Sequence, residues 1–153
     1  MSPSGRFRAL LLAAAIGLGA CGGHDCTEIG CRNSFTIDIE HSGPVPAGSY
    51  ELSVVIAGNE ISCVADFPVP DPAPTATPCP PGSGVVAEFP ASGHAFVRIT
   101  IESAPPDFYL SVARDGTHLA TRTFTPEYSQ SWPNGKDCDV HPCLSATDTM
   151  TID

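Results

Sequence analysis

The sequence is poor in positive charge. Lysine occurs once, at Lys136, and Lys and Arg together number 7 against 17 Asp and Glu, which gives a formal net charge of −10 at pH 7. Proteins that bind nucleic acid by neutralising its phosphates carry clusters of Lys and Arg, so we expect no nucleic-acid partner. Charged residues make up 16% of the chain and apolar residues 42%, a balance that favours a folded domain over disorder.

Familiar catalytic patterns are also missing. The chain has no G-x-S-x-G, H-E-x-x-H or Walker motif. Five histidines are scattered along it, at positions 24, 41, 94, 118 and 141, and we expect them to be surface imidazoles. We therefore expect a non-enzymatic protein with no cofactor. The alternative is a small envelope hydrolase or metal-dependent enzyme that uses His141 and nearby acidic residues.

Residues 1–20 have the composition of an export signal. Arg6 and Arg8 precede an uncharged apolar run that starts at Ala9 and ends in small residues. The run is shorter than the roughly 20 residues that a membrane-spanning helix needs. We interpret it as a signal peptide and expect the mature chain to start at Cys21. Without the two signal arginines, five basic residues remain against 17 acids, so the mature charge is −12.

The end of this segment, Leu18-Gly19-Ala20-Cys21, resembles the lipobox of bacterial lipoproteins. In that family the peptide is cut before the cysteine, whose thiol and new amine carry fatty-acyl chains such as palmitate. The resemblance implies that Cys21 is lipidated and that the protein's first partner is a membrane. Residues 21–25 would then form a short tether and residues 26–153 the folded domain. An ordinary signal peptide followed by a chance cysteine is the alternative.

Six cysteines remain after Cys21, an even number that suits disulfide bonds in an oxidising compartment. Cys63 lies in a strand-like run and Cys79 follows a Pro-rich loop, so we expect these two to pair. Two pairs with the same four-residue gap, Cys26/Cys31 and Cys138/Cys143, flank the domain. We expect one cysteine of each pair to bond one of the other, and local 26–31 and 138–143 bridges are the rival.

Metal binding by residues 138–143 is a weaker interpretation than disulfide bonding. Cys138, Cys143 and His141 are possible zinc ligands, but zinc sites usually combine two tighter C-x2-C motifs. Asp137, Asp139 and Asp115 lack the density of a calcium loop. We expect no metal site and a solvated acidic surface instead.

From residue 34 onward the apolar residues alternate with polar ones, the period of a β-strand. An all-β, antiparallel β-sandwich of about seven or eight strands is the expected fold, Ig-like or transthyretin-like in type. Turns are expected at residues 57–60 and 115–116, and loops at 68–84 and 125–144. The expected strands are 35–40, 50–56, 61–67, 85–89, 95–102, 108–112, 118–124 and 145–152.

The loop at 125–144 carries Tyr128 and Trp132. Aromatic side chains on rigid loops often anchor ligands, so this loop is a candidate ligand site. Alternatively, both rings cover the end of the core. A domain with so few aromatic residues needs them inside, which favours this interpretation.

Three motifs together resemble a group of small bacterial envelope lipoproteins to which no activity is assigned. They are Cys26-x4-Cys31, the strand opening Gly48-Ser49-Tyr50-Glu51, and Pro133-Asn134-Gly135-x2-Cys138-x4-Cys143. The resemblance implies an envelope lipoprotein with a disulfide-linked sandwich. In many lipoproteins an Asp directly after the cysteine resembles a signal for retention in the inner membrane. This sequence has Gly22 there, so the resemblance implies sorting to the outer membrane. An envelope protein or glycan is the expected partner of a binding or structural domain.

Overall fold

The structure, a computed structural model, describes residues 29–68, 79–89 and 95–153. Within them the chain forms nine strands and no helix, arranged as two facing sheets. One sheet has five strands in the order β4-β5-β1-β9-β8, and the other has four in the order β3-β2-β6-β7. The bounds of the five-stranded sheet are β1 Ser34–His41, β4 Val85–Glu88, β5 Ala95–Ile101, β8 Ser129–Ser131 and β9 Cys143–Ile152. Those of the four-stranded sheet are β2 Gly48–Ile56, β3 Asn59–Phe67, β6 Phe108–Arg114 and β7 Thr117–Phe124.

The predicted β-sandwich is confirmed, and its core follows from the period-two pattern. Alternate residues of each central strand point between the sheets, because successive side chains leave a strand on opposite faces. The side chains with no exposed surface come from both sheets: Ile37, Ile39, Val97, Ile99 and Ile101 from one, and Tyr50, Leu52, Val54, Cys63, Leu110 and Val112 from the other. The finer assignment, Ig-like or transthyretin-like, stays a prediction.

Two hairpin turns join neighbouring strands of the four-stranded sheet. Ala57 and Gly58 have φ of 49° and 81°, and Asp115 and Gly116 have φ of 50° and 77°. Two successive residues with positive φ are typical of the tight turn whose twist matches paired strands. The hairpins expected at both places therefore form, β2 with β3 and β6 with β7.

One strand was missed and one pairing was wrong. β8 lies inside the segment expected to be an uninterrupted loop, because its three residues, Ser-Gln-Ser, have no apolar alternation. The sandwich is also not wholly antiparallel, since β1 and β9 pair in parallel, from Ser34 opposite Ser145 to His41 opposite Ile152. β9 therefore starts at the same end of the sheet as β1, and β8 runs antiparallel beside its first residues.

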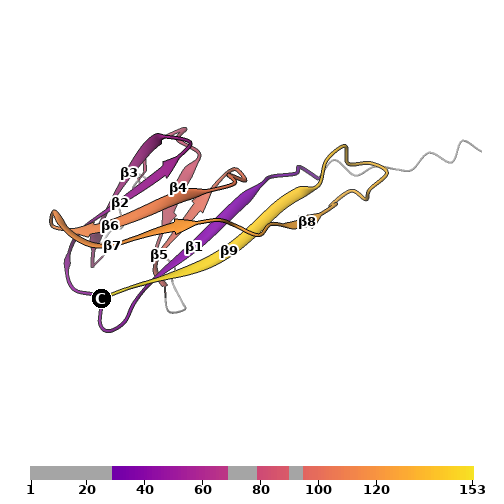
Figure 1. Cartoon of the computed structure of the whole chain (residues 1–153). Coiled ribbons are helices and arrows are strands. Elements are labelled where there is room, and N and C mark those ends of the chain that lie inside the picture. The colour runs from indigo at the N-terminus through magenta and orange to yellow at the C-terminus, as the bar shows by residue number, and fades with distance from the viewer. Residues whose placement is uncertain (1–28, 69–78, 90–94) are drawn as a thin grey trace, which may run out of the picture.

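This pairing gives the molecule two unlike ends. In Figure 1, β8 lies beside the start of β9, the connection between these two strands extends beyond the sheets at that end, and the C-terminus lies near the opposite end. The cysteines that precede β1 and open β9, Cys31 and Cys143, are disulfide-bonded at the extended end. We call this region, residues 29–33 and 129–144, the cross-linked end.

Candidate functional site

The cross-linked end is held by a disulfide that joins residues 112 positions apart. Cys31 and Cys143 are bonded with their Cα atoms 5.3 Å apart. The parallel register explains this proximity, because Ser34 lies opposite Ser145 and both cysteines come just before these residues. Asn33 adds a second link, since its side-chain oxygen accepts a hydrogen bond from the backbone N–H of Leu144 at 2.9 Å. The expected cross-link between the two end segments therefore forms, and the rival local bridges are wrong.

Cys63 and Cys79 form the other expected bridge. Cys63 is fully buried in β3 and Cys79 is 3% exposed, so the disulfide is part of the core and fixes the segment that follows β3. Cys138 is disulfide-bonded as well. Cys21, Cys26, His24 and His94 lie outside the described residues, as do the signal segment and the tether.

Asn134 organises the loop between β8 and β9. Its backbone N–H and side-chain amide donate to the two carboxylate oxygens of Asp139, at 3.0 and 2.6 Å. The same side chain exchanges a pair of 3.0 Å hydrogen bonds with the backbone of Ile29. The loop is thus bonded to the first described residue of the domain. In the sequence, Asn134 belongs to the Pro133-Asn134-Gly135 motif, and no spacing rule points from it to Ile29.

Tyr128 packs against the end of the apolar core. Its hydroxyl donates to the backbone oxygen of Pro105 at 2.9 Å, and its ring meets Phe35 edge-on with centroids 6.3 Å apart. Burial raises the pKa of its phenol. The ring covers the end of the core, as the alternative interpretation of the sequence expected.

Trp132 is different, because it is half-buried in the loop itself and is not part of the apolar core. The ammonium group of Lys136 lies 5.9 Å from the centre of its ring, within the range of a cation–π contact. Trp132 therefore presents part of its ring at the cross-linked end, next to the only lysine of the chain.

His141 and Asp139, the residues considered for the alternative enzyme, both lie in the loop between β8 and β9. Both carboxylate oxygens of Asp139 accept hydrogen bonds from Asn134, which commits this side chain to the loop. His141 is exposed. Within residues 29–68, 79–89 and 95–153, no three His, Cys, Asp or Glu side chains are grouped so as to hold a metal ion.

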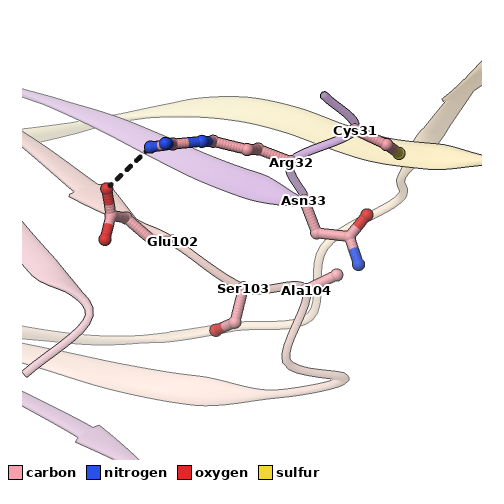
Figure 2. Close-up of a pocket in the computed structure, with 6 residues that line it drawn as sticks. All are labelled: Cys31, Arg32, Asn33, Glu102, Ser103 and Ala104. Atoms are coloured by element: carbon pink, nitrogen blue, oxygen red, sulfur yellow. Dashed lines mark ion pairs between the residues drawn. The ribbon is translucent and has the colours of Figure 1, made fainter. Parts of the chain in front are cut away.

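A groove of about 560 Å³ opens beside the disulfide. It lies between the residues that lead into β1 and those that follow β5, with Arg32 and Asn33 on one side and Glu102, Ser103 and Ala104 on the other (Figure 2). Arg32 and Glu102 approach to 3.9 Å across it, but their side chains are 87% and 51% exposed. An ion pair this exposed contributes little to stability. The groove is an open surface of mixed polar and apolar lining, unlike the enclosed, mostly apolar pockets that bury small molecules.

No family model, curated protein or solved structure matches this chain. In the part of the chain that the structure describes, no helix has the length and apolar character to cross a bilayer.

Proposed function

We propose that this chain is a lipid-anchored cell-envelope lipoprotein, attached through Cys21, whose β-sandwich is a non-enzymatic binding domain. The observation that carries the proposal is the sequence of residues 1–21: two arginines, a short apolar run and Leu18-Gly19-Ala20-Cys21. Acyl chains on one cysteine anchor a protein firmly when there is more than one of them, because each buried methylene contributes roughly 0.8 kcal/mol.

The cross-linked end supports the same proposal. Ile29 is bonded to Asn134 there, and Cys31 to Cys143. Ile29 is the eighth residue after Cys21, and a fully extended chain over that span reaches at most about 28 Å. A domain tethered at Cys21 would therefore hold its cross-linked end toward the bilayer. The opposite end, where β9 terminates, would face away.

Charge also constrains the attachment. A mature domain of −12 is repelled by anionic head groups within a Debye length of roughly 8 Å at physiological salt. Protein charge therefore cannot hold the domain at such a membrane, and acylation must supply the attachment. With Gly22 after the cysteine, we expect retention in the outer membrane.

Fractionation of cells tests anchoring and sorting together. We expect wild-type protein to sediment with membranes, to resist release by 1 M salt and to band with the outer membrane on a density gradient. The Cys21→Ser variant should lose this behaviour, whereas Gly23→Ser, which leaves the cysteine and its preceding residues unchanged, should keep it. Release of the wild type by salt would contradict the lipid anchor, and banding with the inner membrane would contradict the sorting.

A further inference from the structure

The outer face of the four-stranded sheet has a hollow at its centre. It has a volume of about 330 Å³ and is lined by residues of all four strands. Ser53 of β2 lies opposite Ser111 of β6, and Ala113 is the next residue of β6 on the same face. The middle of this outer face is therefore made of small side chains. Larger side chains surround them: Glu51, Glu60, Tyr109 and Thr121.

This face is acidic and has no Lys or Arg among the described residues; it also carries His118, which lies opposite Ala113 with its Nε2 2.8 Å from the hydroxyl oxygen of Thr121. Glu51 and Asp66 are exposed outward-facing residues of β2 and β3, as is Glu60 where β3 begins. The two arginines of the sheet occupy inward-facing positions. Arg114 is opposite the buried Tyr50, and Arg122 is opposite the buried Leu110. Arg122 is also bonded to Asp148 of the other sheet, at 2.8 Å.

The opposite face of the sandwich shows the contrast. On the five-stranded sheet, Arg98 lies beside Asp38 and is held to it by two hydrogen bonds of 2.7 and 2.9 Å. That face therefore carries its own counter-charge. The hollow has only hydroxyl donors next to its carboxylates: Ser53 donates to Glu60, and Ser62 donates to Glu51 at 3.2 Å. A carboxylate offers about four acceptor sites, so each retains capacity for an external donor.

Apolar surface lies between these acids. Tyr109 and Val64, 42% and 53% exposed, are two of the few large apolar side chains that the described residues leave at the surface. Tyr109 lies opposite Val55, which is itself opposite Glu60, and Val64 lies opposite Glu51. The Glu51 carboxylate is thus one strand away from exposed Val64, and the Glu60 carboxylate is two strands away from exposed Tyr109. A ligand with an ammonium or guanidinium group on an apolar stem matches this arrangement, because the stem packs on apolar surface while the head meets the charge.

We propose that this hollow receives a Lys or Arg side chain of a basic partner polypeptide. The inference rests on the proposed function, since it names the partner of the binding domain. Charge complementarity carries it: Glu51 and Glu60 line the hollow, and no Lys or Arg lies on this face among the described residues, which favours a cationic partner and repels anionic ones. The same charge disfavours a second copy of this chain as the occupant, because the mature chain would carry −12.

Binding by the full-length acylated protein in non-ionic detergent tests the proposal. The probe is a fluorescent peptide of alternating lysine and valine at 150 mM salt, and its uncharged counterpart carries acetyl-lysine. We expect saturable binding of the lysine peptide, weakened about three- to tenfold in Glu51→Gln/Glu60→Gln, since exposed ion pairs contribute up to about 1 kcal/mol each. Ser111→Phe, which fills the hollow and keeps the charges, should weaken binding as well.

The matched control removes the same charge from the other face. Glu40→Gln/Glu88→Gln alters outward positions of β1 and β4 and should change the affinity by less than twofold. Equal loss in both double variants would mean that the peptide senses only overall charge, and the proposal would be wrong. Binding of acetylated peptide or of a neutral N-acetylglucosamine oligosaccharide more tightly than the lysine peptide would also overturn it. Mass analysis of the same samples separates the two ideas, because acylated protein that fails to bind contradicts this inference alone.

Discussion

Asp38 and Arg98 form the best-aligned charged pair among the described residues. The guanidinium group of Arg98 donates one hydrogen bond to each carboxylate oxygen of Asp38, a fork in which both bonds are shorter than 3 Å. The two residues lie directly opposite each other on β1 and β5. The hydrogen bonds from Arg98 hold the pKa of Asp38 below its usual range, and the positive charge of Arg98 acts in the same direction. Asp38 in turn raises the pKa of Arg98.

This pair makes stability depend on pH in a defined direction. A carboxyl group whose pKa is lowered by folding stabilises the folded state above its unfolded pKa, about 3.9 for Asp. That contribution disappears as the pH falls through the lower folded pKa. We therefore expect Asp38→Asn to unfold at lower urea concentration than wild type at pH 7, and the difference to shrink below about pH 4. Urea titrations monitored by circular dichroism at pH 7, 5, 4 and 3 measure it.

The matched control is Glu40→Gln, which removes one carboxylate from the same face of β1. Glu40 is not part of the fork, so its variant should stay close to wild type at every pH. A difference for Asp38→Asn that is as large at pH 3 as at pH 7 would contradict the assigned cause.

At the scale of elements, the apolar alternation predicted eight strands and the structure has a strand at each place. β8 was beyond prediction because its ladder to β9 is made by backbone groups beneath three exposed polar side chains. The parallel pairing of β1 and β9 was not predicted, although the positions of two cysteines indicate it. Cys31 precedes the first strand and Cys143 opens the last, so a bridge between them requires the two strands to start at the same end.

The candidate site was less predictable than the fold. The Cys63–Cys79 bridge and a cross-link between the two end pairs were predicted, but the sequence left open which cysteine of each end pair takes part. The position of Tyr128 against the core followed from the need to bury aromatic rings. The link from Asn134 to Ile29 spans 105 residues and depends on the loop conformation that Asp139 fixes, so no local pattern encodes it. The hollow on the four-stranded sheet depends on register, because small residues of β2 and β6 must lie opposite one another.

The two described disulfides should stabilise different elements. Cys63–Cys79 closes 16 residues, which corresponds to about 3 kcal/mol in the chain-entropy account. We expect Cys63→Ser/Cys79→Ser to lower the free energy of unfolding by about this amount and to speed amide exchange in β3. Cys31→Ser/Cys143→Ser should instead speed exchange at the starts of β1 and β9, around Phe35 and Leu144. Hydrogen-exchange mass spectrometry of both variants compares them, and faster exchange confined to β3 in both would refute the element-specific roles.

At the scale of the whole molecule, the features that bear on function are separated in space. The chain enters the sandwich at the cross-linked end, whereas the hollow with Glu51 and Glu60 lies on the outer face of the four-stranded sheet. An anchor at Cys21 would place the cross-linked end toward the membrane and leave that face open to the surrounding compartment. The two proposals therefore fit one arrangement, in which the lipid end attaches and the sheet face binds.

Intact-mass spectrometry of the protein extracted from membranes tests the central claim most directly. The account predicts one mature species that begins at residue 21, carries fatty-acyl mass on its first residue and has no free α-amine. Cys21→Ser should yield no acylated species. A wild-type chain that begins at any other residue, or that begins at Cys21 with a free amine and an unmodified thiol, would contradict the account.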